Sequence, residues 1–398
     1  MLAAALCMLG SCSSDEPSGG GSNEFLPIKL DTNQKTIVDR NSRMAVEILD
    51  DMAAVTDKNE FISPLSLNMV LSMLANGAEG ETREQILKLL SMEDGASLAE
   101  LNELNKTIVS RLPGMDKRVK MYMANAIWLN SGFDPLKPFK SAVNDYYNAE
   151  IRSLNFETGM DVMNRWCADN TSGMIQNFFT TPPLGKAVIM NASYFDGEWL
   201  LPFDPSRTVA ETFYSKSGAT NKVGMMSVDK MSMPYHENDI MQMGILFFGN
   251  MAYQMMIILP REGKTFADCL DYDAYYDANA KCFGAGGIID LKLPKFSLDC
   301  TTKFGTLIES KGMDKILGKG ADYSGISNSD VTFDDIIQKS RIEVTETGAK
   351  AATVTATSGY SAPPPPIRSE MVVNRPFLFL IKESSTGTVV FGGIVNNL

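Results

Sequence analysis

Histidine is almost absent from this chain. His236 is the only histidine among 398 residues. A histidine-ligated metal site or a Ser-His-Asp triad would therefore depend on that single side chain. It stands in the polar run Pro-Tyr-His-Glu-Asn-Asp, which is typical of an exposed loop. The sequence thus argues against an enzyme, and it predicts no metal site and no cofactor.

Cysteine is also scarce and lacks the spacing of a metal or redox site. Two of the six cysteines, Cys7 and Cys12, belong to the N-terminal segment. No pair among the other four has Cys-x-x-Cys spacing, which argues against zinc binding and thioredoxin-like chemistry. In an exported protein two of these four could form a disulfide, and free buried thiols are equally consistent with the sequence. The four are Cys167, Cys269, Cys282 and Cys300.

Two further absences concern partners and membranes. No apolar run approaches the roughly 20 residues that a transmembrane helix needs. The net charge is −12, which argues against nucleic acid or an anionic membrane surface as a partner. The chain is long enough for one large domain or several smaller ones, but no internal repeat or linker follows Glu24. We therefore expect residues 24–398 to form a single domain.

Residues 1–23 predict export, a lipid anchor and a flexible tether. A short apolar core, Leu2–Leu9, leads into the sequence LGSC, which resembles a bacterial lipobox ending in a lipidated Cys12. Asp15 and Glu16 resemble a surface-export signal of some Gram-negative bacteria, and the Gly/Ser-rich stretch after them is typical of a tether. We expect a protein held in the outer membrane only by this lipid, facing either the surface or the periplasm. The alternative is a plain secretory signal with a chance cysteine.

Helix and strand patterns occur together along the domain, which predicts an α+β fold. Apolar residues recur at helical spacing over Asn41–Lys58, with Asn41 or Ser42 as the expected N-cap. Ser63 and Pro64 suit an N-cap and a first helical turn, and the apolar run after them predicts a buried helix. Val119–Asn130 alternates and predicts a long strand inside a sheet.

The segment Glu343–Pro376 combines features of a loop and of a strand. It begins at the end of the alternating pattern IIQKSRIEV, and after Glu346 nothing larger than Lys, Val or Thr occurs until Tyr360. Four prolines, Pro363–Pro366, follow, and an apolar strand pattern resumes at Met371. Small, β-capable and nearly uncharged residues between two strands predict a segment that can adopt either state.

Ordered motifs from about Asn33 to Leu398 resemble the serpin family. FISPLS resembles the start of the buried helix beneath the main sheet, MANAIWLN resembles the third strand of that sheet, and NASYFDGEWLLPFDPSRT is the strongest local match. ANGAEGETREQIL, LPKF, ADYSGIS and NRPFLFLI continue the series. Met174 departs from the family, which often has lysine there. The resemblance implies the serpin fold: three β-sheets, eight or nine helices and an exposed reactive-centre loop.

The resemblance implies an inhibitor rather than an enzyme. Inhibitory serpins are suicide substrates: a serine protease attacks the reactive loop, forms an acyl-enzyme, and is trapped when the cleaved loop inserts into the main sheet. The nucleophile belongs to the protease. Some serpins also trap papain-like cysteine proteases. Others are non-inhibitory binding or carrier proteins, and this is the alternative function.

Alignment on Glu346 and Gly348 as the family's hinge predicts which side chains enter the core on insertion. Alternate residues of an inserted strand point beneath the sheet. A charge or a proline among them would stall insertion, because a buried unpaired charge or a lost ladder hydrogen bond is costly. Neither is present, so the resemblance implies a hinge that is competent for inhibition. The inward set is Ala349, Ala351, Thr353 and Thr355, and the outward set begins with Lys350, Ala352 and Val354.

The resemblance implies that the protease cuts a bond just before the proline run. The family's usual spacing from Glu346 places the cut directly before Pro363, but most serine proteases cleave poorly before proline, so we expect it one or two residues earlier. Ala or Ser before the cut suits an elastase-like enzyme first, and Tyr suits a chymotrypsin-like enzyme second. Arg368 would suit a trypsin-like enzyme but lies too far along the loop. The candidate region is Tyr360, Ser361, Ala362 and Pro363.

The resemblance also assigns residues to the region where the main sheet opens. Ser63, Ser66 and Asn191 match the family's polar shutter residues. Gln338 replaces the family's usual histidine, which keeps hydrogen bonding but removes pH-dependent opening at that position. Trp199 matches the residue beneath the point where insertion begins. All five would serve equally as core or cap residues in a non-inhibitory member.

Overall fold

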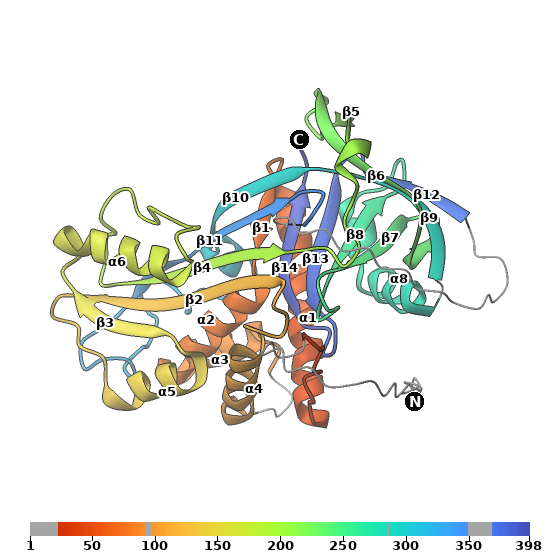
Figure 1. The fold of residues 1–398 in the computed structure, drawn as a ribbon. Coiled ribbons are helices and arrows are strands. Elements are labelled where there is room, and N and C mark those ends of the chain that lie inside the picture. The colour runs from red at the N-terminus through yellow and green to blue at the C-terminus, as the bar shows by residue number, and fades with distance from the viewer. Residues whose placement is uncertain (1–22, 93–96, 285, 349–367) are drawn as a thin grey trace, which may run out of the picture.

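A five-stranded main sheet forms one side of the molecule (Figure 1). The computed structural model describes residues 23–92, 97–284, 286–348 and 368–398. In order across the main sheet the strands are β10 (Phe296–Lys303), β11 (Phe333–Val344), β4 (Ala187–Gly197), β2 (Val119–Asn130) and β3 (Glu150–Leu154). The middle strand, β4, runs parallel to β11 and antiparallel to β2.

The strand expected from Val119–Asn130 is confirmed with those bounds as β2. Its expected place as the third strand is wrong, because β2 lies second from the edge and β4 is third. The two strands have similar apolar patterns, and the pairing partners that decide their order lie far away in the sequence.

β4 is buried on both faces, which explains its nearly continuous apolar sequence. On one face, Val188 and Met190 pack in a cluster with Phe156 and Met163 of α6 (Phe156–Asn170), which covers that part of the main sheet. On the other face, Ile189 belongs to the large central core. Any strand added beside β4 would therefore meet a covered face on each side.

The remaining strands form a second and a third sheet that are joined through β6. Across them the order is β1 (Glu60–Ile62), β14 (Val389–Val395), β13 (Phe377–Glu383), β8 (Tyr253–Pro260), β7 (Met241–Phe247), β6 (Thr220–Glu237), β9 (Gly286–Pro294) and β12 (Arg368–Val372), with β5 (Val209–Tyr214) also on β6. The 18-residue β6 pairs with β7 at one end and with β5 and β9 over the rest. The second sheet consists of β1, β14, β13, β8, β7 and the adjoining end of β6. The third sheet consists of the rest of β6 with β5, β9 and β12, so β6 belongs to both sheets and connects them.

The described residues contain nine α-helices and one short 3-10 helix. Besides α6 these are α1 (Thr32–Val55), α2 (Pro64–Gly77), α3 (Gly80–Leu89), α4 (Leu98–Arg111), α5 (Lys137–Tyr147), α7 (Phe266–Leu270), α8 (Tyr272–Gly284), α9 (Gly305–Ser310) and η1 (Pro205–Arg207). None of the helices in these described ranges has both the length and the apolar character needed to cross a membrane. The α+β class expected from the sequence is confirmed.

Two helix starts show how local residues fix the elements. Ser63 caps α2 by accepting a hydrogen bond from the Ser66 N–H, with Pro64 at the first helical position, as expected. The expected cap of α1 at Asn41 or Ser42 is wrong, because Asp31 forms a capping box and the helix begins at Thr32. The polar first turns of α1 concealed its start from the apolar pattern.

Candidate functional site

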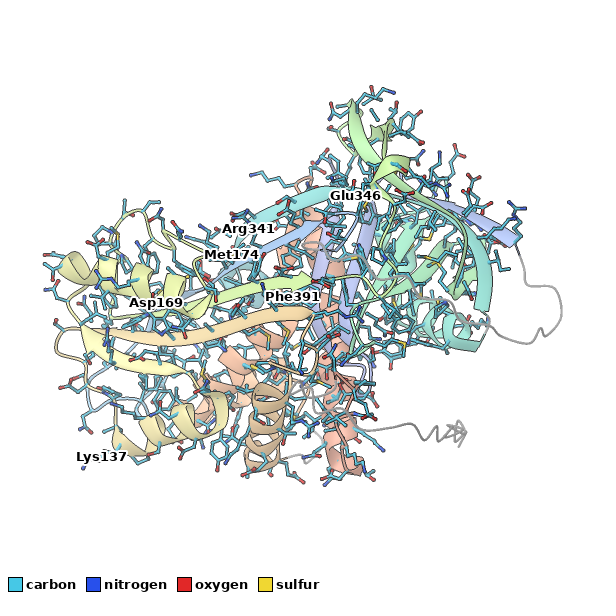
Figure 2. The ribbon with its side chains drawn as sticks, viewed as in Figure 1. Lys137, Asp169, Met174, Arg341, Glu346 and Phe391 are labelled. Atoms are coloured by element: carbon cyan, nitrogen blue, oxygen red, sulfur yellow. The ribbon has the colours of Figure 1, made fainter. Side chains whose placement is uncertain are left out.

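A two-residue hairpin follows β11 and forms the centre of the candidate site. The N–H of Thr345 donates to the carbonyl oxygen of Gly348 over 3.1 Å, and the N–H of Gly348 donates back to Thr345 over 3.1 Å. Glu346 and Thr347 form the turn between them. Figure 2 places Glu346 at the end of the main sheet that adjoins the second sheet. The chain leaving β11 therefore reverses direction within four residues.

Gly348 lies between the extensions of β11 and β4. It forms isolated antiparallel bridges with Thr345 and with Glu198, which directly follows β4. Its φ angle is +92°, and a Cβ atom there would overlap the carbonyl oxygen of Gly197 and lie 2.7 Å from the nitrogen of Trp199. This position needs glycine both for its backbone conformation and for its close approach to β4.

Glu346 anchors the hairpin. Its carboxylate forms an ion pair with Lys295 at 2.9 Å and accepts a hydrogen bond from the Thr208 hydroxyl at 2.8 Å. Its carbonyl oxygen accepts from the Phe203 N–H at 2.8 Å. Partial burial acts to raise the pKa of Glu346, but hydrogen bonds from Lys295, its own backbone N–H and Thr208 outweigh burial, and the pKa is lowered. Glu346 is therefore ionised at neutral pH.

Trp199, the residue that the sequence places beneath the start of insertion, contacts the hairpin directly. Its indole Nε1–H donates to the carbonyl oxygen of Thr345 at 2.9 Å, and its backbone N–H donates to that of Thr347 at 3.0 Å. Its ring stacks on Phe248 with centroids 4.4 Å apart, and 2% of the residue is exposed. Two hydrogen bonds and a stacked ring thus fix the turn to the end of β4.

Ser63 and Gln338 join α2 to β11. The Ser63 N–H donates to Gln338 Oε1 at 2.6 Å, and Gln338 Nε2 donates to the Ser63 carbonyl oxygen at 3.1 Å. The Ser63 hydroxyl donates to the Val390 carbonyl oxygen of β14 at 2.8 Å. Gln338 thus bonds to Ser63 through both its amide oxygen and its amide nitrogen, and it carries no titratable charge.

A second line of polar contacts connects α2 with β4 and β2. The hydroxyls of Ser66 and Ser193 lie 3.2 Å apart, the Ser193 hydroxyl donates to Asn191 Oδ1 at 3.0 Å, and Asn191 Nδ2 donates to Asn125 Oδ1 at 2.5 Å. All four residues are buried. The sequence comparison identified Ser66 and Asn191 but missed Ser193 and Asn125. Ser193 lies two residues from Asn191 on the same face of β4, and this strand periodicity was the available signal.

The reactive loop residues named from the sequence lie outside the described ranges. They are Ala349, Lys350, Ala351, Ala352, Thr353, Val354, Thr355, Tyr360, Ser361, Ala362 and Pro363, and Cys12 of the lipobox also lies outside. Their assigned roles stay predictions. On the far side of the loop, Arg368 begins β12, pairs with β9 and forms a 2.9 Å ion pair with Asp290.

His236 and the cysteines take structural positions. His236 lies in β6 and is partly buried, so the exposed loop expected there is wrong. The polar residues on the outward face of β6 hid its period-two apolar pattern. Cys167, Cys269, Cys282 and Cys300 are all free thiols, and burial raises the pKa of each to about 12. Within the described residues no group of three His, Cys, Asp or Glu side chains could hold a metal.

Comparison with known proteins agrees with this geometry. Residues 39–398 match the model of the family described as Serpin (serine protease inhibitor). Iripin-8 of Ixodes ricinus is 30% identical over 380 residues, covering 90% of this chain and 92% of that protein. Serpin I2 of Homo sapiens is 26% identical, covering 90% of this chain and 91% of that protein.

Solved structures give the same result. The thermophilic serpin tengpin in its native state has a TM-score of 0.81 at 27% identity, with 94% of this chain and 96% of that chain covered. The chain belongs to the serpin family. The family is described as one of serine protease inhibitors rather than enzymes, so the expectation that the chain has no catalytic activity of its own follows from its family.

Proposed function

We propose that this chain inhibits serine proteases as a suicide substrate and traps them as covalent acyl complexes. The family supports the general activity, protease inhibition. The hairpin from Thr345 to Gly348 carries the finer mechanism, because it already turns the chain back toward the boundary of β11 and β4, where Gly348 bridges to Glu198. A new strand can therefore grow from Gly348 without first forming a turn.

The register of that bridge supports the predicted inward and outward sets. Continuing the antiparallel pairing of Gly348 with Glu198 brings Thr353 opposite Ser193 and Thr355 opposite Asn191. Directly opposed residues point to the same face of a sheet, and Ser193 and Asn191 belong to the buried polar line beneath it. Threonine hydroxyls at these positions would meet polar partners instead of a purely apolar core.

The same register limits how much of the loop can insert. β4 has 11 residues, Ala187–Gly197, and these would pair with residues 349–359. At about 3.3 Å per residue this strand is about 36 Å long. The predicted cut region, Tyr360 to Pro363, begins directly beyond it. Insertion would thus carry an attached protease along the whole of β4.

The change in strand pairing also favours insertion energetically. Entry of the loop must separate β11 from β4, which pair in parallel from Phe333 to Ile342. The inserted strand would run antiparallel to both, so one parallel pairing is replaced by two antiparallel pairings, which are the more stable kind per residue. Small inward side chains keep the packing cost low.

The chemistry uses the protease's own nucleophile. Its serine oxygen would bond to the carbonyl carbon before the cut, the peptide C–N bond would break, and the amine would leave with a proton as a new N-terminus. The residue before the cut stays attached to the protease as an ester. Insertion would then carry the ester-linked protease away from the new N-terminus, so that the peptide bond cannot re-form. No group of the inhibitor takes part as acid or base.

The proposed targets are elastase-like enzymes first and chymotrypsin-like enzymes second, since the residues before Pro363 are Ala, Ser and Tyr. A papain-like cysteine protease is a further target class within the same mechanism. We also propose export with a lipid at Cys12, which would place the inhibitor at the outer membrane. The competing function is a non-inhibitory carrier, and the experiment below separates the two.

The test is to incubate the protein with neutrophil elastase, pancreatic elastase, chymotrypsin, trypsin and papain. We expect denaturant-resistant covalent complexes with the elastases, fewer with chymotrypsin and none with trypsin. The released C-terminal peptide should begin at Ser361, Ala362 or Pro363, and the cleaved protein should unfold at a higher temperature. Cleavage with neither a complex nor a rise in unfolding temperature would exclude the inhibitor mechanism and favour the carrier.

A further inference from the structure

Ser340 of β11 carries a buried hydroxyl without a hydrogen-bond partner among the described residues. None of its surface is exposed, and its Oγ is one of the few buried side-chain oxygens that no described residue contacts at hydrogen-bond distance. Buried polar atoms are nearly always paired, because an unpaired one loses its hydrogen bonds to water without replacement. The uncut chain therefore bears the free-energy cost of this hydroxyl.

Ser340 points beneath the main sheet, between two neighbouring strands. Gln338, two residues earlier on the same face of β11, bonds to the start of α2 beneath the sheet. Ser340 is the register partner of Ser193 on β4 and of Cys300 on β10. The Ser193 hydroxyl already donates to a carboxamide oxygen, and the Cys300 thiol donates to a backbone carbonyl oxygen. Neither neighbour is bonded to Ser340.

The hairpin determines which loop residue would reach Ser340 on insertion. Gly348 forms an antiparallel bridge with Thr345, which directly follows β11. Thr353 lies five positions after Gly348, and Ser340 lies five positions before Thr345. Continuing the pairing therefore places Thr353 opposite Ser340, just as the pairing on the β4 side places it opposite Ser193. The two sides agree, because Ser340 and Ser193 are already register partners in the uncut sheet.

The loop sequence matches the polar and apolar rows that the two strands present beneath the sheet. Where both strands have polar side chains, the loop has threonine, and where they have apolar ones closer to the hinge, it has alanine. The rows, each written as β11 residue, loop residue and β4 residue, are Gln338–Thr355–Asn191, Ser340–Thr353–Ser193 and Ile342–Ala351–Phe195. The hydroxyl without a partner thus lies in a row where the loop brings a hydroxyl.

We propose that Ser340 is a positioning residue for insertion and that its hydroxyl pairs with Thr353 of the inserted loop. The inference rests on the proposed function, because the pair forms only after cleavage. Directly opposed side chains have Cβ atoms about 4.5–5.5 Å apart, which is within reach of two hydroxyls. A hydroxyl both donates and accepts, so Ser340 donates to Thr353 and Thr353 donates in turn to Ser193, whose oxygen can accept a second hydrogen bond.

This pair favours insertion in one register. It removes the cost of the unpaired hydroxyl, so part of the free energy released on insertion comes from Ser340 itself. A slip by one residue would place Ala352 or Val354 opposite Ser340 and turn Thr353 to the other face of the sheet. The hydroxyl would then stay unpaired, and the slipped strand would be the less stable one.

Unfolding temperatures before and after cleavage by pancreatic elastase test the proposal. In the uncut chain, Ser340→Ala should leave the unfolding temperature unchanged or raise it, because the substitution removes a hydroxyl that has no partner. In the cleaved chain it should reduce the rise that cleavage causes, by about 1–3 °C for one hydrogen bond. Thr353→Val should reduce the rise by a similar amount, and the double variant should lose no more than either single variant.

Thr357→Val is the matched control, because it makes the same change in the same loop. Thr357 also points inward by alternation, but the register places it between Ile336 and Ile189. No hydroxyl is available to it there, so Thr357→Val should keep the full rise in unfolding temperature on cleavage or increase it.

Two results would overturn the inference. One is a lower unfolding temperature of uncut Ser340→Ala, which would show that the hydroxyl is paired before cleavage. The other is a rise on cleavage that neither Ser340→Ala nor Thr353→Val reduces. A parent chain that itself shows no rise on cleavage would overturn the proposed function together with this inference, so failure of the pair alone is distinguishable from failure of insertion.

Discussion

At the scale of single residues, the hinge conformation requires glycine at position 348. Its positive φ and its contact with Gly197 exclude any Cβ atom. We expect Gly348→Ala to detach the hairpin from β4, because backbone strain of about 1–2 kcal/mol adds to a direct clash. Hydrogen exchange should become faster at the Trp199 N–H, whose acceptor is the Thr347 carbonyl oxygen.

Gly387 provides the control for that substitution. Its φ is also positive, at +79°, but a Cβ atom there meets nothing within 4 Å. Gly387→Ala should therefore cost only the backbone strain and leave exchange at Trp199 unchanged. Equal exchange in the two variants would show that the hinge does not need its close approach to β4.

The role of a residue was predictable from the sequence where its hydrogen-bond partner is nearby in the chain. It was only partly predictable where the partner lies far away in the chain. Ser63 was recognised as a cap because its partner is three residues away. Asn125 was not, because its partner Asn191 lies on another strand. Gln338 was placed at the shutter by family resemblance, and the structure supplied its two bonds to Ser63.

At the scale of elements, inhibition depends on the strand that the loop would form on insertion. Ala349 follows Gly348 directly and would be the first inward residue. Ala349→Arg should turn the inhibitor into a substrate, because a guanidinium without a partner would enter the core beside Gly197. Gel analysis should show cleaved protein in place of the covalent elastase complex.

Lys350→Arg is the matched control for this element. It changes an outward residue that would lie opposite Asp196, so the ratio of complex to cleaved product should stay as in the parent chain. Unchanged inhibition by Ala349→Arg would mean that the register continued from Gly348 is wrong by one residue.

Element limits were predicted best where the apolar period is unbroken. Val119–Asn130 matches β2, and the helix expected after Ser63 matches α2. The order of the strands was not available in this way, since a parallel pair such as β4 and β11 joins segments that lie far apart in the sequence, as in the pairing of Ala187 with Phe333. The fold itself was predicted by the ordered series of family motifs, because no single element specifies three sheets.

At the scale of the whole molecule, one buried lysine makes stability depend on pH. Lys382 of β13 is 7% exposed, and burial lowers its pKa to about 8, partly opposed by Asp39. The folded protein binds fewer protons than the unfolded chain between about pH 8 and pH 10.5, so stability rises with pH across this window. Below pH 8 the full cost of the buried charge is present.

Lys382→Met should remove that cost. We expect the free energy of unfolding to rise by up to about 3 kcal/mol at pH 7, because each unit by which folding lowers the pKa of Lys382 costs about 1.4 kcal/mol. This gain should disappear above about pH 10.5. Urea unfolding at pH 7, 9 and 10.5 measures it, with Lys120→Met on the exposed face of β2 as the control. A loss of stability that is the same at all three values would show that Lys382 is paired and contributes to the core.

The positions of the tryptophans have an optical consequence. The chain has three tryptophans. Trp199 is bonded to the hairpin at one end of β4. Near the other end of β4, Trp166 of α6 packs edge to face on Trp128 of β2 with ring centroids 6.0 Å apart, and Trp128 is paired there with Val188. Emission from Trp199 reports the first step of strand entry, and emission from the pair reports displacement of α6. With Trp199→Phe and Trp166→Phe, a stopped-flow record can time the arrival of the loop at each end without any added label.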